Sequence, residues 1–439
     1  MATKLEEIAA KARAEPNLQF TSLCHHVTKE RVRRCLEHIS IQSAPGIDDI
    51  KVDRAKEYFE NWIQPMLQAV HRKGYKAPPV RRVWIPKPGK AEKRPLGIPC
   101  IADRALQRSV SEVMSVIYEE DFMPCSFGGR PKLSAHHALS TLNEIISGKK
   151  IGWVYEADLK NFFCSLDHGW LLKFVKHRVG DPRILNLIIR WLKAGVMEED
   201  KWQISDSGTP QGGSISVLLS NIYLHYALDL WFEKIVKPRL GGEAYLIRFI
   251  DDFVVCFQYR RDAKRFQQAL EKRLDKFGLK LEPSKTRLVE FGRFAQRDAK
   301  KWNRKMETIY FLGFTHYCTR NRKGNFMVGR KTEKTRMRRS VKKLRQLMRE
   351  IRHHHLKDQV KAINRVLRGH YAYYGLGGNH RSLWAIYRIT EKYWHKMLKS
   401  RCRKSKMTWE KFNKLKKYYS PKLPQLKLSF YQMKEMAVL

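Results

Sequence analysis

The chain has 439 residues, a length sufficient for two or three globular domains. Hydrophobic residues make up 43% of it, which excludes a disordered protein. Lys and Arg total 87 against 43 Asp and Glu, and the net charge of +44 indicates a polyanionic partner such as nucleic acid. No apolar run approaches the ~18 residues of a membrane span and no signal-peptide pattern opens the chain, so we expect a cytoplasmic protein that does not contact a membrane.

The first third of the chain is expected to be mainly helical. Residues 28–70 favour helices with a loop at 43–50. The stretch 77–100 favours a β-hairpin and loop, because six prolines interrupt a basic segment. Helices are expected to follow over 103–118 and 134–147.

Strands and helices alternate through the middle of the chain. The stretch "KKIGWVYEADLKNFF" (149–163) is typical of a strand that ends at Asp158. A Gly/Pro turn in "SDSGTPQGG" precedes a long helix with apolar residues at helical spacing. Further helices are expected over 168–178, 181–195 and 261–277, and strands around Asp251 and Asp252 and near 286–291 and 308–317.

The last part of the chain differs in charge. Residues 326–439 hold 31 Lys or Arg against 6 Asp or Glu, which predicts a domain boundary near residue 326. Apolar residues then recur at helical spacing and predict three helices. The histidines 353–355 are not expected to hold a metal, because adjacent side chains on a helix diverge. The eight cysteines form no Cys-x-x-Cys pair, so we expect reduced thiols.

The stretch "LIRFIDDFVVCF" (246–257) places two aspartates between apolar, β-favouring runs. Only Asp251 and Asp252 separate the runs, which predicts a two-residue hairpin turn that exposes both carboxylates. Adjacent anions repel, and a hard divalent cation such as Mg²⁺ is the usual compensation, with an ordinary polar turn as the alternative. Asp158, closing another strand, favours a two-metal site for in-line nucleotidyl transfer.

Several sequence blocks follow one another in order along nearly the whole chain. They are "RRVWIPKPGKAEKRPLGIPC", "SFGGRPKLSAHHAL", "EADLKNFFCSLDH", "SGTPQGGSISVLLSNIYLH", "FIDDFVV", "LKLEPSKTRLVEFG", "YFLGFTHY" and "INRVLRGHYAYYG". In this order they resemble the reverse transcriptases of group II introns and their group II-like relatives. The resemblance implies an α+β right-hand polymerase, with an N-terminal extension over 1–75, fingers and palm over 76–325, and a basic three-helix thumb or maturase domain over 326–439.

The resemblance also implies roles for single residues. Asp158, Asp251 and Asp252 would be catalytic and would bind Mg²⁺, with Mn²⁺ as the alternative ion. Phe163 would exclude a nucleotide 2′-hydroxyl, and a plain core aromatic is the other interpretation. For the basic and glycine-rich positions, a solvated surface or a simple turn is the other interpretation. Candidates for nucleotide contacts are Lys87, Arg94, Gln211 and Lys285, and candidates for template or primer contacts are Arg130, Pro210, Gly212, Gly213, Phe249 and Ile250.

Two features depart from the family pattern. The sequence Phe249-Ile250-Asp251-Asp252 stands where Tyr-Ala-Asp-Asp is usual, and the branched Ile250 is expected near the primer end. An isoleucine there resembles certain group II-like enzymes that serve in DNA break repair. The sequence also ends soon after the thumb without Cys and His metal ligands, so we expect no self-contained endonuclease.

We therefore expect an RNA-directed, and also DNA-directed, DNA polymerase of the bacterial cytosol or nucleoid. Its partners would be RNA and DNA template-primers, deoxynucleoside triphosphates and, in a homodimer, a second copy of the chain. A stand-alone use in pairing and filling broken DNA ends is favoured over intron mobility. The alternatives are a maturase that assists intron splicing and mobility, and a mainly RNA-binding maturase. An RNA-dependent RNA polymerase is the weakest alternative, because Phe163 argues against it.

Overall fold

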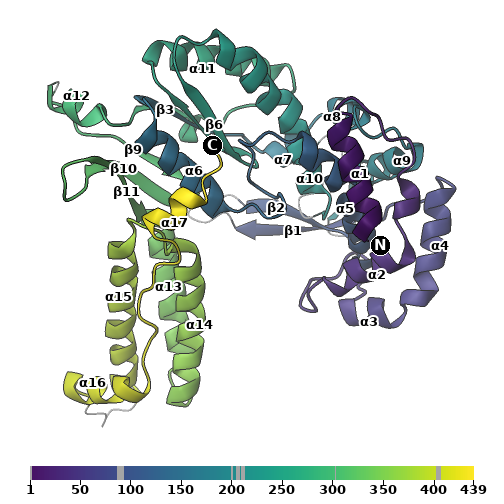
Figure 1. The fold of residues 1–439 in the computed structure, drawn as a ribbon. Helices are drawn as coiled ribbons and strands as arrows, with labels where there is room; N and C mark the ends of the chain where they lie inside the picture. The colour runs from purple at the N-terminus through teal and green to yellow at the C-terminus, as the bar shows by residue number, and fades with distance from the viewer. Residues whose placement is uncertain are drawn as a thin grey trace.

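The computed structural model contains a four-stranded antiparallel sheet, called the central sheet below, whose strands are in the order β6-β7-β3-β8. Figure 1 labels two of them, β3 and β6. The strands are β3 (Trp153–Asp158), β6 (Ala244–Phe249), β7 (Asp252–Phe257) and β8 (Arg287–Glu290). The structure describes residues 2–86, 93–198, 201–203, 208, 213–301, 303–401 and 407–439.

Both faces of this sheet are covered. Helix α6 (Ala135–Gly148) contributes Leu142 to the cluster that holds Val254 of β7, and α11 (Arg260–Asp275) contributes Phe266 to the cluster that holds Tyr155 of β3. The Tyr155 and Phe266 rings meet edge to face, with centroids 5.8 Å apart. Burial on both faces explains why the strands are almost continuously apolar in sequence.

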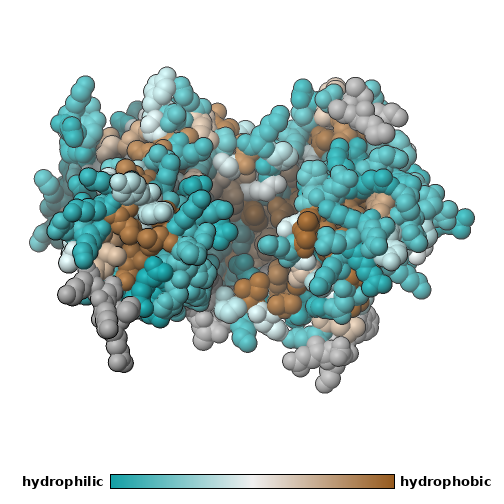
Figure 2. Space-filling model, turned by 90° about the horizontal axis from the view of Figure 1, so that it is seen from below, coloured by the Kyte–Doolittle hydropathy of each residue, from teal (hydrophilic) through white to brown (hydrophobic). Residues whose placement is uncertain are grey.

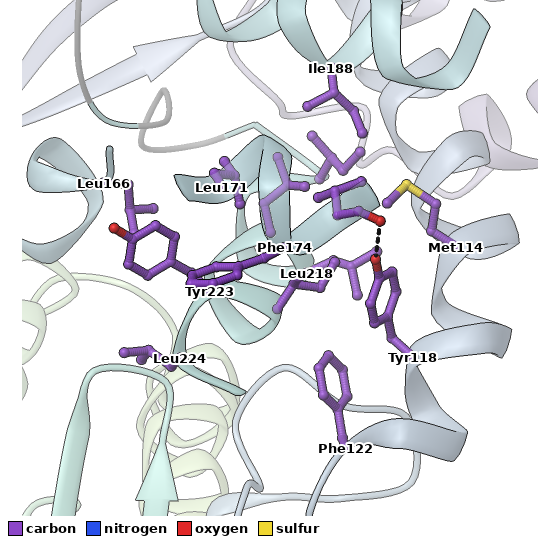
Figure 3. Packing of buried hydrophobic residues seen from close by; sticks show 14 of the residues in the cluster. Met114, Tyr118, Phe122, Leu166, Leu171, Phe174, Ile188, Leu218, Tyr223 and Leu224 are labelled. Carbon is purple, nitrogen blue, oxygen red and sulfur yellow. Dashed lines mark hydrogen bonds between the residues drawn. The ribbon is translucent and has the colours of Figure 1, made fainter. Parts of the chain in front are cut away.

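The larger hydrophobic core lies beside the sheet, among α5 (Ile101–Asp121), α8 (His168–Lys176), α9 (Pro182–Leu192) and α10 (Ser216–Leu224). Figure 3 shows Tyr223 lying beside Phe174, and their ring centroids are 5.3 Å apart. The Tyr118 hydroxyl group donates to the Val175 carbonyl oxygen at 3.0 Å, so its polar atom is satisfied inside this apolar core. After α10 the expected long helix widens into two π-helical turns, His225–Asp229 and Phe232–Val236.

The N-terminal helices pack on the outer side of α5. They are α1 (Ala2–Ala14), α2 (Lys29–Glu37), α3 (Val52–Glu57) and α4 (Phe59–His71), as the helical pattern over 28–70 predicted for the last three. The buried guanidinium of Arg178 donates to the carbonyl oxygens of Ala12, Glu15 and Leu18. Of these, Ala12 lies in the last turn of α1, where the helix leaves its carbonyl group without a helical partner.

A second sheet carries the proline-rich basic segment. Strands β1 (Val80–Pro86) and β2 (Lys93–Ile98) form the expected hairpin. Two short strands that the sequence pattern did not indicate, β4 (Val196–Glu198) and β5 (Lys201–Gln203), extend the sheet beyond β1. Strands this short carry no measurable alternation of polar and apolar residues, so only the pairing reveals them.

A third sheet precedes the C-terminal helices and has the order β11-β10-β9. Its strands are β9 (Thr308–Phe311), β10 (Phe314–Arg320) and β11 (Phe326–Thr332), and the short α12 (Ala295–Lys301) precedes them. The boundary expected at residue 326 coincides with the start of β11, which pairs along its length with β10. The helices therefore begin at Lys334, after the sheet is complete.

The first of the three expected C-terminal helices is two helices in the structure, α13 (Lys334–Glu350) and α14 (Leu356–Tyr374). The three histidines lie in the connection between them, so the premise that these residues are helical is wrong. The Gln359 side chain donates to the carbonyl oxygens of Arg352 and His354 and fixes this connection. Helices α15 (His380–Lys399) and α16 (Trp409–Tyr418) complete a shared apolar core with α13 and α14.

The last residues return from the far end of these helices to the central sheet (Figure 1). Leu428 accepts a hydrogen bond from the backbone of Gly377, and α17 (Phe430–Glu435) packs against α6. Figure 2 shows the molecule hollowed between two lobes whose surfaces are mainly hydrophilic. Among the helices described, none combines the length and apolar character needed to cross a lipid bilayer.

Candidate active site at the turn between two strands

The hairpin predicted around the paired aspartates is present, but its turn lies one residue earlier than expected. Phe249 pairs with Asp252, so the turn residues are Ile250 and Asp251, and Asp252 opens β7. Across the sheet Asp252 pairs with Asp158, the last residue of β3. Directly paired residues of antiparallel strands have Cβ atoms about 4.5–5.5 Å apart, so the sheet brings these two carboxylates together beside Asp251.

This grouping raises the pKa values of two of the carboxyl groups. Partial burial, and then the charge of Asp158, raise the pKa of Asp251 to about 6. Burial, followed by the charges of Asp158 and Asp251, raises the pKa of Asp252 to about 8. Ionisation of these carboxyl groups is unfavourable because their negative charges repel one another, so a cation bound beside them would stabilise the ionised form.

Lys285 supplies a cation at this site. It belongs to the 3₁₀ turn Pro283–Lys285, which is fixed to β3 because the Glu282 amide donates to the Asp158 carbonyl oxygen at 2.8 Å. The Lys285 ammonium group donates to Asp158 Oδ2 and forms an ion pair with it. Burial lowers the pKa of Lys285, but the bond to Asp158 and the charges of all three aspartates outweigh it, so the pKa rises.

The donor set suits hard divalent cations. The three aspartates offer carboxylate oxygens only. The ion pair between Lys285 and Asp158 shows that a cation can lie beside these oxygens. Within the described residues no three His, Cys, Asp or Glu side chains form a group that could by itself hold a metal ion. Mg²⁺ is commonly held by one or two carboxylates together with substrate phosphates, which is a requirement that these aspartates meet.

Phe163 lies on the short helix α7 (Phe162–Ser165), which follows Asp158. Phe162 is buried in the core, whereas Phe163 is only partly buried and packs on it with ring centroids 5.5 Å apart. Gly208 approaches this helix so closely that an added Cβ would lie 2.7 Å from the Phe163 carbonyl oxygen. His168 fixes Gly208 through a 2.7 Å hydrogen bond to its carbonyl oxygen.

The other predicted contact residues are placed unevenly. Gly213 is buried before α10, whereas Lys87, Pro210, Gln211 and Gly212 lie outside the described residues. Arg94 is exposed on β2, and its charge acts to lower the pKa of Asp251, so the basic hairpin reaches the electrostatic environment of the turn.

Arg130 is engaged within the protein. Its Nε donates to Glu119 at 2.9 Å, and its Nη1 donates to the carbonyl oxygens of Met123 and Ser126 at 3.0 Å. The guanidinium also lies over the Phe122 ring. These contacts hold the loop after α5, and a contact between Arg130 and a template stays a prediction.

Sequence reasoning overlooked Arg248 and Asp229, a fully buried ion pair beneath the turn. The sequence feature that could have indicated the pair is the single charged residue inside the apolar run "YLIRFI", since a buried charge needs a buried partner. It also overlooked Gly128, where an added Cβ would lie 2.6 Å from the Ile250 backbone nitrogen. Phe249 and Ile250 are both partly buried beside the carboxylates.

Comparison with known proteins gives these observations a context. Residues 85–316, which include all three aspartates, match the family model described as "Reverse transcriptase (RNA-dependent DNA polymerase)". Protein YkfC of Escherichia coli is 34% identical over 246 residues, covering 54% of this chain and 63% of that protein. The group II intron-encoded protein LtrA of Lactococcus lactis is 33% identical over 246 residues, covering 54% of this chain and 41% of its own length. The chain thus spans less than two thirds of each of these two relatives.

Proposed function

The chain belongs to the reverse transcriptase family, and from that premise we propose that it extends an annealed primer with deoxynucleotides, copying RNA and also DNA. One observation carries the proposal: the sheet pairs Asp158 with Asp252 beside Asp251, at the strand ends. Carboxylates gathered in this way would hold the divalent cations that stabilise the charge developed in nucleotidyl transfer. The family implies a right-hand polymerase fold, and the mixed helices and sheets are consistent with it.

We assign the three aspartates to divalent cations, Mg²⁺ before Mn²⁺. Such ions, when bound, stabilise charge on the attacking and leaving oxygens of an in-line displacement. In that displacement the primer 3′-oxygen bonds to the α-phosphorus as the bond to pyrophosphate breaks. Lys285 neutralises Asp158 in the free enzyme, and its protonated Nζ is our candidate to give a proton to the departing pyrophosphate.

Phe163 is our candidate for rejecting ribonucleotides, since its ring lies on the helix that follows Asp158 and is not fully buried. Arg94 of the basic hairpin is our candidate for the triphosphate, because guanidinium groups suit phosphate oxygens. Phe163→Ala should raise the relative use of ribonucleotides by about 10- to 100-fold, a range typical of a lost steric contact. Competition between one ribonucleotide and its deoxynucleotide at equal concentration measures this ratio. A ratio that stays unchanged would show that Phe163 is a core residue.

We assign the helices from Lys334 onward to the thumb and the hollow between the lobes to the template-primer duplex (Figure 2). Residues 326–439 hold 31 Lys or Arg against 6 acidic residues, which suits contact with phosphates rather than with particular bases. Ile250 is partly buried at the turn, and we assign it a position beside the primer end. We also propose that the enzyme acts on its own in filling paired DNA ends.

Primer extension by the purified chain tests the proposal. Matched RNA and DNA templates, together with single strands that pair over a few bases at their 3′ ends, would be compared in Mg²⁺ and Mn²⁺. The double variant Asp251→Ala, Asp252→Ala should abolish extension, whereas Asp275→Asn, an exposed carboxylate on α11, should not change it. If the unaltered chain extends no primer on any of these templates, the proposed polymerase activity is wrong.

A second candidate function is that of a maturase, which binds and stabilises intron RNA. The basic C-terminal helices favour it, and it is compatible with polymerisation in one chain. RNA binding by the double aspartate variant separates the two functions. Tight, specific binding of a structured intron RNA without any extension by the unaltered chain would favour the maturase.

A further inference from the structure

The guanidinium of Arg248 on β6 is fully buried, and each of its N–H groups has an acceptor. A guanidinium has five such donors. The acceptors are Asp229 Oδ1 at 2.8 Å from Nε, Asn221 Oδ1 and the Ile250 carbonyl oxygen at 3.0 Å from Nη1, and Ser126 Oγ at 2.7 Å and Asp229 Oδ2 at 2.6 Å from Nη2.

Asp229 provides the compensating charge. Neither side chain of the pair is exposed to solvent, and the two bonds to Arg248 form a bidentate pair of fixed geometry. Asp229 ends the π-helical turn His225–Asp229, where the helix after α10 widens. Single π-helical turns of this kind are often found at functional sites, because the extra residue redirects the side chains that follow it.

The bond from Arg248 to the Ile250 carbonyl oxygen reaches the catalytic turn itself. Ile250 has a φ of +59°, which is rare for a β-branched residue and persists only where the surroundings impose it. Its carbonyl group is part of the peptide that joins Ile250 to Asp251. Fixing this oxygen therefore fixes the backbone from which the Asp251 side chain projects.

The opposite side of the turn is also fixed by this network. Asn221, which accepts from Arg248, donates its amide to the Gly128 carbonyl oxygen at 2.8 Å. Gly128 packs against the Ile250 backbone so closely that no larger residue fits there without movement. The Phe127 and Arg248 backbones are also joined by a 2.9 Å hydrogen bond. The buried charge thus ties the turn to the segment 125–128 and to α10.

We propose that Arg248 and Asp229 are positioning residues that hold the Ile250–Asp251 peptide in its strained conformation and so set the rate of nucleotidyl transfer. The inference rests on the proposed polymerase function. Neither residue reaches the surface, so neither touches template or nucleotide. Their loss should lower the rate of the chemical step and leave substrate affinity nearly unchanged.

The test uses Arg248→Lys, which keeps the charge but cannot replace the planar fork. Single-turnover incorporation on a preassembled primer-template, well below the melting temperature, gives the maximal rate and the apparent nucleotide affinity separately. We expect the rate to fall by about 10- to 100-fold, as for other groups that align a reacting centre, and the nucleotide affinity to change less than about threefold. Arg178→Lys, at a buried arginine whose guanidinium donates to carbonyl oxygens of residues 12–18 and makes no hydrogen bond to the turn, is the matched control and should lower only the melting temperature.

A second variant tests how Arg248 acts. Glycine adopts positive φ without strain, so Ile250→Gly should need less restraint from the buried pair. The loss caused by Arg248→Lys should therefore be several-fold smaller in the Ile250→Gly background than alone. An equal loss in both backgrounds would contradict restraint of the turn.

The outcomes separate this inference from the polymerase proposal. If the unaltered chain extends primers and Arg248→Lys keeps its maximal rate, Arg248 is only structural and the inference is wrong. If Arg248→Lys does not fold, Ser126→Ala, which removes one neutral acceptor, should lower the maximal rate about two- to fivefold, in line with one lost hydrogen bond. An unchanged rate in Ser126→Ala would overturn the inference in that case. If the unaltered chain itself fails to extend primers, the polymerase proposal fails instead.

Discussion

Two buried guanidinium groups, one beside the Ile250–Asp251 turn and one at the attachment of the C-terminal residues, are held in opposite ways. Arg248 makes a bidentate ion pair with Asp229. Arg330 of β11 donates instead to the Met433 sulfur at 2.7 Å and to Asn143 Oδ1 at 2.6 Å, and its Nε has no partner within the described residues. Burial lowers the pKa of Arg330 to about 10, although the charge of Glu144 opposes this effect.

The difference shows where the fold requires a charge. At the Ile250–Asp251 turn, Arg248 donates to the carbonyl oxygen of a residue with positive φ, and removal of either partner of the ion pair would leave the charge of the other buried and unpaired. At the C-terminal attachment the arginine fills space between α6, β11 and α17, where its guanidinium lies 5.6 Å from the centre of the Phe430 ring and has no ion-pair partner among the described residues. The first region should therefore be sensitive to charge and the second to shape.

The largest expected effect on folding comes from Asp229→Ala. It leaves the Arg248 charge unpaired in the core and should lower the free energy of unfolding by about 3–5 kcal/mol. Urea denaturation at neutral pH measures this loss. A cost below about 1 kcal/mol would mean that Arg248 finds another partner and that the two regions are alike.

A smaller effect should appear in the pH dependence of stability without divalent cations. The folded pKa values of Asp251, about 6, and Asp252, about 8, lie above the ordinary value near 3.9. The stability that their protonation gives is complete below pH 4 and is lost as the pH rises through 6 and 8. We expect a loss of about 3 kcal/mol between pH 6 and pH 8, mostly from Asp252, at about 1.4 kcal/mol per pH unit for one proton.

Denaturation in a chelator at several pH values measures this slope, and Asp252→Asn should flatten it. Arg330 should contribute no slope in this range, because with a pKa of about 10 in the folded protein it stays protonated in both the folded and the unfolded state. A flat profile for the unaltered chain would show that the carboxylates are not coupled in the folded protein.

The smallest effect is expected for Arg330→Met. A methionine occupies similar space and removes a charge that has no ion-pair partner in the part of the chain that the structure describes, so the free energy of unfolding should change by about 1 kcal/mol or less, in either direction. Thermal melting of this variant beside Asp229→Ala sharpens the contrast. A loss as large as that of Asp229→Ala would contradict the assignment of a packing role to Arg330.

Much of this arrangement was predictable from sequence. The apolar runs around Asp158 and around the Asp-Asp pair indicated the strands, and helical spacing indicated α5, α6, α8 and α11. The turn could not be placed to the residue, because strands buried on both faces show no alternation that would distinguish a one-residue shift. The single charge of Arg248 in an apolar run signals a buried partner, but no local pattern identifies Asp229 and Ser126 as its partners, because they are distant in the chain.

The charge shift near residue 326 falls at the start of a strand, before the first C-terminal helix begins at Lys334, for a similar reason. Strand β11 carries Arg330 and Lys331, and its basic composition resembles that of the helices that follow it. Its pairing with β10 is a contact between segments, which composition does not report.

The most direct test of the central claim is single-nucleotide incorporation on an RNA template by the unaltered chain and by Asp158→Asn. Asp158 comes from a different strand from the Asp-Asp pair, so it tests the shared site rather than the motif. We expect a loss of at least about 1,000-fold, as for removal of a central catalytic charge, with thermal stability at pH 8 no lower than that of the unaltered chain. Incorporation within tenfold of the unaltered chain would contradict the three-carboxylate site.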